Sequence, residues 1–447
     1  MTSSNTNLGL PKYCKNLIIG AGPSGLTLAH QLLALGHKDV LILEAASSIG
    51  GLCQSTVSED GAVFDIGGHS FHTPHPRVKA LVDGLVRHRG GMQYQKRDAR
   101  IRFNGEEIGY PFQQNFQFLK DRRTVAECKD GLVAEKHGVP SNLEEHLRLK
   151  FGAGICEHFM LPYNRKLWRF PLKEIAHDWA SERVADTKAQ DPVMKDTRKP
   201  LEADSLVGYP SLTGFDGIFE SLAEWVGHDN IRLNCKVTRI IEDEKTVVFW
   251  RYGKVHYMAY DRLFSTMPLP NLMDMATFIH VESERCYTAL RHTSLLLVRI
   301  ITDHYKVNSP QRLYTADAES LAHKYAFNNL SSSEWAETKN KAIMAEISFI
   351  GSELIPVQKT YFMQNSLIWL AENGYLPTAN SEDYKGDVLE VKYSYPIYTH
   401  GRKEVVDRSK EILKKHSIYS LGRFGSWHYM NSDGCINEAI LLAESVS

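Results

Sequence analysis

The sequence lacks any paired cysteine motif. Its seven cysteines lie singly, without a CxxC spacing, at Cys14, Cys53, Cys128, Cys156, Cys235, Cys286 and Cys435. Structural zinc sites and disulfide frameworks both need grouped cysteines, so this spacing argues against either of them. We therefore expect reduced thiols, no bound metal and a cytoplasmic location.

The chain also lacks an excess of charge of either sign. Its 52 Lys and Arg residues balance 53 Asp and Glu residues, for a formal net charge of -1. A protein without a net field does not attract polyanions in general, so any phosphate must be held by a local site. Nucleic acid is therefore not an expected partner.

Long apolar runs are missing as well. The first 15 residues contain no apolar stretch typical of a signal peptide, and no later run reaches the roughly 20 apolar residues of a membrane helix. We expect no membrane association. With 447 residues, of which 43% are hydrophobic, the chain is long enough for more than one core. Two or more lobes around a shared cleft are predicted.

The first fifty residues have the pattern of a βαβ unit. Residues 16–19 predict a buried strand, residues 23–36 a helix with one apolar face, and residues 39–43 a second strand that ends at Glu44. Such a unit has parallel strands. It predicts an α/β fold at the N-terminus.

A glycine-rich turn links the first strand to the helix. Gly20, Gly22, Ser24 and Gly25 lie where a tight turn lets a pyrophosphate approach the helix N-terminus. Glu44 closes the second strand about twenty residues later, where a carboxylate can accept ribose hydroxyls. Strand, helix and acidic residue together favour a dinucleotide site over an ordinary glycine turn.

A second glycine turn distinguishes an FAD site from an NAD site, because both kinds of site contain the first glycine-rich turn. Gly50, Gly51 and Leu52 follow Glu44 closely and add backbone amides near the same pyrophosphate. This arrangement resembles the extended fingerprint of the FAD-binding superfamily that contains amine oxidases, protoporphyrinogen oxidase and UDP-galactopyranose mutase. The resemblance implies FAD as the cofactor. It assigns these further residues to the cofactor: Gly67, Gly68, Val237, Thr266, Gly422, Arg423, Asp433 and Ile436.

Outside these segments, nearly the whole chain resembles the UDP-galactopyranose mutase family, especially its eukaryotic type. The loop at residues 64–69 is similar to the family loop that places a histidine, here His69, beside the flavin ring. Two glycines free this loop, which favours an active-site histidine over a structural one.

The resemblance also implies a uridine pocket. Tyr110, Phe112 and Gln113 match the family motif that encloses the uracil, and Asn164 and Trp168 match the helix that completes the pocket. Taken alone, such aromatics are more often core residues. Because Asn164 and Trp168 are four apart, they share one helix face. The two motifs together favour uridine recognition.

A diphosphate site is implied in the same way. Arg183 matches one of two family arginines, and Tyr314, Tyr395 and Tyr429 match tyrosines that the family places on the phosphates.

The second arginine is missing from this sequence. Lys324 is the nearest cation, with His323 beside it, and the alignment leaves both open. A lysine lacks the bidentate fork of arginine, so it would hold a phosphate with less orientation.

The function that the resemblance implies is interconversion of the pyranose and furanose forms of a UDP-sugar, UDP-galactopyranose or a close analogue. N5 of the reduced flavin would attack the anomeric carbon as UDP leaves, with His69, Arg183 and Lys324 as the catalytic residues. NADPH or NADH is the expected reductant, and a homo-oligomer is left open. The alternatives are an FAD oxidoreductase of the amine oxidase or protoporphyrinogen oxidase type and a non-catalytic flavoprotein that binds UDP-sugars.

Three domains are predicted from these patterns. Residues 1–85, 207–290 and 400–447 form a Rossmann-like FAD-binding domain, residues 86–206 an inserted helical domain, and residues 291–399 a mostly antiparallel sheet domain.

Overall fold

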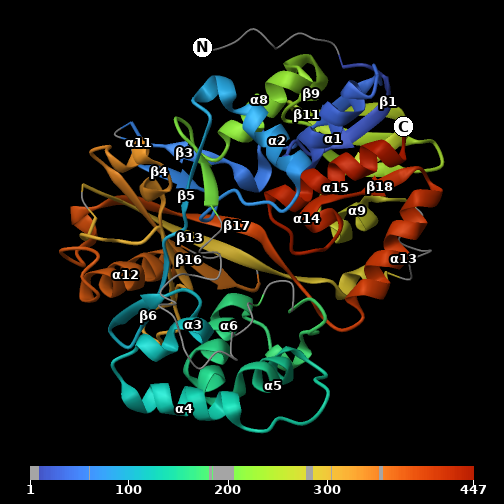
Figure 1. Cartoon of the computed structure of the whole chain (residues 1–447). Helices are drawn as coiled ribbons and strands as arrows, with labels where there is room; N and C mark the ends of the chain where they lie inside the picture. The colour runs from blue at the N-terminus through green and yellow to red at the C-terminus, as the bar shows by residue number, and fades with distance from the viewer. Residues whose placement is uncertain are drawn as a thin grey trace.

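The computed structural model describes residues 10–59, 61–180, 184, 206–277, 285–303, 305–351 and 356–447. This part of the chain forms two seven-stranded sheets with helices on their faces, and a helical lobe beside the second sheet (Figure 1). Within these residues no helix is long and apolar enough to cross a membrane.

The first sheet contains the predicted βαβ unit. Strand β1 (Tyr13–Ile19) lies between β12 (Lys254–Ser265) and β2 (Val40–Leu43) and runs parallel to both. Helix α1 (Pro23–Ala34) connects β1 to β2 and packs against α15 (Ser432–Ser445), as the blue and red helices of Figure 1 show. The predicted Rossmann-like fold is confirmed.

Helices cover both faces of the first sheet. One face packs against α1, α15, α2 (Pro76–Leu85) and α8 (Gly217–Val226), and the other against α9 (Leu269–Met275) and α13 (Arg402–Lys415). The remaining strands of this sheet are β9 (Ile231–Arg232), β10 (Lys236–Ile241), β11 (Thr246–Arg251) and β18 (Ile418–Ser420). Burial on both faces explains why β2 and residues 17–19 of β1 are continuously apolar.

The second sheet is mostly antiparallel, as predicted, and has the order β17-β13-β16-β15-β14-β6-β7. Only the β14–β6 pair is parallel. Its strands are β6 (Ala99–Phe103), β7 (Glu106–Gly109), β13 (Arg291–Thr302), β14 (Arg312–Thr315), β15 (Lys324–Phe327), β16 (Lys341–Phe349) and β17 (Lys385–Ile397). Helix α12 (Pro356–Glu372) covers one face, where Trp369 stacks on Tyr325 with ring centroids 4.5 Å apart.

The helical lobe consists of α3 (Phe112–Asn115), α4 (Arg122–Val133), α5 (Leu143–Ile155), a π-helical turn (Cys156–Met160) and α6 (Leu161–Trp168). Asn142 caps α5 by accepting a hydrogen bond from the backbone N–H of Glu145 at 3.0 Å. The short elements elsewhere are β3 (Ser55–Val57), β4 (Val63–Asp65), β8 (Leu206–Pro210), α11 (Ser333–Ala336) and α14 (Gly422–Gly425).

The prediction of a helical domain at residues 86–206 is wrong for one part of that range. Residues 92–109 form strands: β5 (Met92–Lys96), which pairs with β8, and the β6–β7 hairpin, which extends the second sheet. The reason is a two-residue period in β6, where buried Ala99, Ile101 and Phe103 alternate with Arg100 and Arg102. This alternation of apolar residues and arginines is the period of a strand with one buried face, and it does not fit a helix. The division into three domains otherwise stays a prediction.

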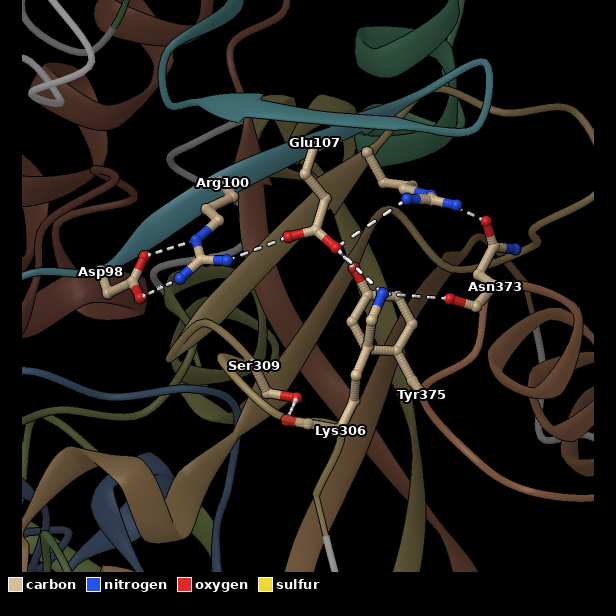
Figure 2. A network of polar contacts seen from close by, with 8 residues as sticks. Asp98, Arg100, Glu107, Lys306, Ser309, Asn373 and Tyr375 are labelled. Atoms are coloured by element: carbon tan, nitrogen blue, oxygen red, sulfur yellow. Dashed lines mark hydrogen bonds and ion pairs between the residues drawn. The ribbon is translucent and has the colours of Figure 1, made fainter.

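A polar network anchors the β6–β7 hairpin to the rest of the second sheet (Figure 2). The carboxylate of Glu107 accepts hydrogen bonds from Tyr375 at 2.6 Å and Arg100 at 3.1 Å, and lies 3.4 Å from the ammonium of Lys306. Arg100 is also paired with both oxygens of Asp98. The network ties the hairpin to the segment after β13 and to the residues after α12.

We predict that Glu107→Gln lowers the free energy of unfolding by about 1–3 kcal/mol, because it leaves partly buried cations without their carboxylate. Chemical denaturation measures the change. Glu444→Gln is the control, since its ion pair with Arg77 is exposed and should contribute little.

The stability lost in the Glu107→Gln variant should depend on pH. Burial raises the pKa of Glu107, but hydrogen bonds from Tyr375 and Arg100 and the charge of Lys306 outweigh it, so the pKa lies below its ordinary value of 4.5. A carboxyl group whose pKa is lower in the folded state stabilises the protein at a pH above its unfolded-state pKa. This stabilisation is lost as the pH falls through the folded-state pKa. A Glu107→Gln deficit that stays constant down to pH 3 would contradict this assignment.

Candidate active site

A cavity of about 770 Å³ lies where the first sheet, the second sheet and the helical lobe meet. Most residues that the sequence predicts for the cofactor and the substrate line it, although they come from segments far apart in the chain. They are Gly20, Gly22, Ser24, Glu44, Gly51, Leu52, Gly67, Gly68, His69, Tyr110, Phe112, Gln113, Asn164, Trp168, Val237, Thr266, Tyr314, Lys324, Tyr395, Gly422, Arg423 and Tyr429.

Five predicted site residues are not among those that line the cavity. Gly25, Gly50, Asp433 and Ile436 are absent from the lining, and Ile436 of α15 is buried in the core of the first sheet. Arg183 lies outside the described residues. The roles predicted for all five therefore stay predictions.

The two glycine turns pack directly against each other at one end of the cavity. A Cβ added to Gly51 would lie 3.3 Å from the Cα of Gly22, and one added to Gly20 would lie 2.1 Å from the hydroxyl of Thr266. Side chains cannot enter this contact. Helix α1 begins here without a side-chain cap, so backbone amides are left at its N-terminus for an anion.

Glu44 lies beside the first turn. One of its carboxylate oxygens accepts the backbone N–H of Ala21 at 2.7 Å, and the other accepts that of Ala46 at 2.7 Å. The carboxylate is therefore fixed in place at the end of β2, where the sequence predicts contact with a ribose.

Arg423 offers two hydrogen-bond donors to the cavity. Its Nε and Nη2 atoms are buried and have no hydrogen-bond partner within the described ranges. The guanidinium carbon lies 5.0 Å from the ring centroid of Tyr395 and 4.7 Å from that of Tyr429. Buried N–H groups without a partner are costly, so the site suits a bound molecule with acceptors here. Together with the glycine turns, this donor set fits a flavin dinucleotide.

His69 is fixed by backbone groups. Its Nε2 lies 2.9 Å from the carbonyl oxygen of Ile66 and 3.0 Å from that of Leu52, and carbonyls only accept, so Nε2 carries the proton. The ring stacks on Phe215 with centroids 4.8 Å apart, and burial lowers its pKa. A neutral imidazole of fixed orientation therefore lines the cavity.

Tyrosines dominate the opposite end. Tyr110 packs against Tyr314 with centroids 4.7 Å apart, and Tyr395 against Tyr429 at 5.2 Å. Between them lies Tyr163, which the sequence reasoning missed although it stands next to Asn164 in the recognised motif. Burial raises the pKa of Tyr163 and of Tyr395 well above 10, so their hydroxyls remain protonated donors.

The predicted base-binding residues form a packed wall. Trp168 is 1% exposed and donates its Nε1–H to the Asn164 side-chain oxygen at 3.1 Å. Asn164 in turn donates to the carbonyl of Met160 at 2.8 Å, and buried Phe112 stacks on Phe159 at 4.7 Å. These residues line the cavity but are almost fully buried, and the polar atoms of Asn164 and Trp168 stabilise α6.

Lys324 and His323 differ sharply in charge. His323 is buried, and burial lowers its pKa to about 3, so it is neutral. Lys324 forms an ion pair of 2.8 Å with Glu346, whose side chain is 1% exposed. Glu346 also lines the cavity and was missed by the sequence reasoning. Its signal is a carboxylate placed within the apolar run of β16.

Comparisons with known proteins give the same result as the fold. Residues 18–85 match the family described as NAD(P)-binding Rossmann-like domain. The chain is 24% identical over 444 residues to dTDP-fucopyranose mutase of Escherichia coli, covering 96% of this chain and 97% of that protein. It is 28% identical over 182 residues to UDP-galactopyranose mutase of Mycoplasma pneumoniae, covering 36% of this chain and 41% of that protein.

A solved structure resembles the whole chain. The crystal structure of reduced UDP-galactopyranose mutase superposes with a TM-score of 0.85 at 24% identity, covering 97% of this chain and 93% of that one. The structure of a putative protoporphyrinogen oxidase from Exiguobacterium reaches a TM-score of 0.71 at 17% identity. Both show the fold.

We predict that Gly25→Ala abolishes retention of the dinucleotide, because the added Cβ would lie 1.9 Å from the backbone oxygen of Gly20 and push the first turn out of shape. Absorbance of the purified protein measures the bound flavin. Gly84→Ala in α2, where a Cβ meets nothing within 4 Å, is the control and should keep full flavin content. Equal retention in both variants would contradict the prediction.

Proposed function

We propose that this chain, a relative of UDP-galactopyranose mutase and dTDP-fucopyranose mutase, is an FAD-dependent isomerase that interconverts the pyranose and furanose forms of a nucleotide sugar. One observation carries this proposal. A single cavity joins the two glycine turns of a dinucleotide fold to a chamber of tyrosines from other lobes. Flavin and nucleotide sugar would therefore lie in contact.

FAD supplies the covalent chemistry when it is bound in reduced form. The glycine turns would hold its pyrophosphate by backbone amides, Glu44 its ribose, and Arg423 an acceptor near the flavin end. A nicotinamide dinucleotide, NADPH or NADH, is the proposed reductant. None of the histidines or cysteines stands in a motif for covalent attachment, so the flavin should be released by denaturation.

The chain's own residues bind and orient the nucleotide sugar. Protonated tyrosine hydroxyls can donate to the diphosphate without adding charge, which suits a protein of net charge -1. Arg183 is proposed to add the cation that stabilises the diphosphate as it leaves. Neutral His69 would contact the flavin edge, and the aromatic wall around Trp168 would exclude water.

The nucleotide has two candidates. We propose a UDP-sugar, because the Tyr110 and Trp168 motifs resemble a uridine pocket. The second candidate is a dTDP-sugar, which the match to dTDP-fucopyranose mutase along 96% of this chain favours. Uracil and thymine differ by one methyl group, a difference that an apolar pocket resolves weakly.

The test is product analysis. The protein, reduced anaerobically, is incubated with UDP-galactopyranose and separately with dTDP-fucopyranose, and the furanose isomer is sought by chromatography. We expect isomer from at least one substrate, and none without reduction. Oxygen consumption that is independent of any nucleotide would instead indicate an oxidoreductase, and UDP binding without product would indicate a binding protein.

We predict that Tyr110→Ala weakens binding of UDP by about tenfold to a hundredfold, since base stacking on an aromatic ring contributes roughly 1–3 kcal/mol. Titration calorimetry measures this affinity. Flavin content should not change, because the residue lies outside the glycine turns. Parallel loss of flavin and UDP would show that Tyr110 is needed for folding instead.

Arg183→Ala should lower kcat by about a hundredfold or more, because a charge-assisted contact to the leaving diphosphate would be lost. Steady-state assays of the reduced enzyme give kcat. Arg183→Lys should recover part of it. If both variants turn over at the wild-type rate, Arg183 does not contact the diphosphate.

A further inference from the structure

Three neighbouring strands of the second sheet bring charged side chains to the loop at residues 66–69, which follows β4. Strands β14, β15 and β16 lie side by side, and Arg312, Lys324 and Glu346 come from one strand each. Lys324 and Glu346 are direct partners in the β15–β16 register. All three side chains lie near residues 66–69, the loop that carries His69.

Two of these side chains form hydrogen bonds with the loop backbone. The N–H of Gly68 donates to Glu346 Oε1 at 2.7 Å, and the carbonyl oxygen of His69 accepts from Arg312 Nη2 at 2.6 Å. A Cβ on Gly68 would lie 2.6 Å from the Nε of Arg312, so the guanidinium packs directly against the peptide. Opposite charges thus fix the peptide unit before Gly68 and the one after His69.

The hydrogen bond from Gly68 is stronger when Glu346 is ionised. Burial alone raises the pKa of this carboxyl group, but the charge of Lys324, a contribution from His323, and the hydrogen bonds from Lys324 and Gly68 outweigh it, so the pKa lies below its usual value. His323 is neutral, so Lys324 is the cation in contact with the carboxylate. The ammonium is bound at 2.8 Å to an oxygen that also holds the loop.

We propose that Glu346 is a positioning residue that orients the His69 loop at the flavin edge, with Lys324 as its counterion and not as the second cation of the diphosphate site. This inference rests on the proposed function, because it concerns the same cavity. A buried carboxylate without a counterion is costly. Loss of Lys324 should therefore disturb the loop before it disturbs the binding of UDP.

The test compares Lys324→Met, Glu346→Gln and the double variant with the wild type. Three quantities are measured: the dissociation constant of UDP, kcat of the reduced enzyme, and the visible spectrum of the bound flavin. For Lys324→Met we expect a tenfold or larger fall in kcat and a shifted flavin spectrum, with the UDP dissociation constant within twofold of wild type. Lys166→Met removes another partly buried lysine, which among the described residues donates to the backbone carbonyls of Thr315 and Asp317, and should leave the flavin spectrum unchanged.

The double variant separates the two roles of Lys324. A neutral Met–Gln pair leaves no buried charge without a partner, so kcat should recover at least threefold from Lys324→Met. If Lys324→Met instead weakens UDP binding tenfold or more with an unchanged flavin spectrum, or if the double variant is no better than the worse single variant, the inference is wrong.

Failure to fold would not leave the question open. If Lys324→Met does not retain flavin, Glu346→Gln decides: a tenfold loss of kcat with UDP affinity within twofold supports the positioning role, and wild-type kcat and spectrum overturn it. The flavin spectrum and UDP affinity do not depend on product. A wild-type protein that forms no furanose isomer would therefore refute the proposed function while these two comparisons still decide the role of Lys324.

Discussion

The loop at residues 66–69 is where the two sheets meet, and the geometry of the site depends on how that loop is held. Its backbone contacts Glu346 and Arg312 from the second sheet, and its histidine donates to the carbonyl of Leu52 beside the second glycine turn. No apolar contact fixes a peptide orientation as tightly, because hydrogen bonds to charged groups are directional and short. The dinucleotide end and the tyrosine end of the cavity are therefore aligned through buried charge.

The cavity presents neutral donors at both of its ends, beside a small excess of basic over acidic side chains, with Arg97, Lys236, Lys324 and Arg423 against Glu44 and Glu346. At the cofactor end, backbone amides of the glycine turns and the N-terminus of α1 face the space, and at the other end protonated tyrosines do so. Among the described lining residues, Lys324 is already paired with Glu346, and Arg423 lies over two tyrosine rings. Neutral donors stabilise a diphosphate without binding it too tightly to leave, which suits a reaction in which the nucleotide departs and returns.

Local sequence patterns predicted the elements that are determined by residues close together in the chain. The βαβ unit follows from apolar runs and glycine spacing, and most strands of the second sheet follow from β-branched and aromatic runs. The β6–β7 hairpin was missed although Arg100 and Arg102 alternate with apolar residues in β6. Glu107 of β7 is bound by Tyr375 and Lys306, which are distant in sequence. A pairing across more than two hundred residues leaves no local signal.

The same reason limits the prediction of the site. The resemblance assigned Lys324 to the diphosphate site, which stays a prediction, and in the structure Lys324 lines the cavity. Its partner Glu346 comes from a strand whose residues are almost all buried, so the local pattern contains no sign of the pairing. Tyr163 was missed because an aromatic residue on a helix is usually a core residue. Residue types thus indicated which segments converge, while the charge of each group depended on neighbours that only the folded chain supplies.

We propose that one cavity holds the flavin and the nucleotide diphosphate side by side. The most direct measurement is a difference spectrum of the oxidised, flavin-loaded wild-type protein during titration with UDP. We expect a saturable change in the visible flavin bands, with the same midpoint as the heat of UDP binding. Saturable heat without any change in the flavin bands would show that UDP binds away from the flavin and would contradict this arrangement.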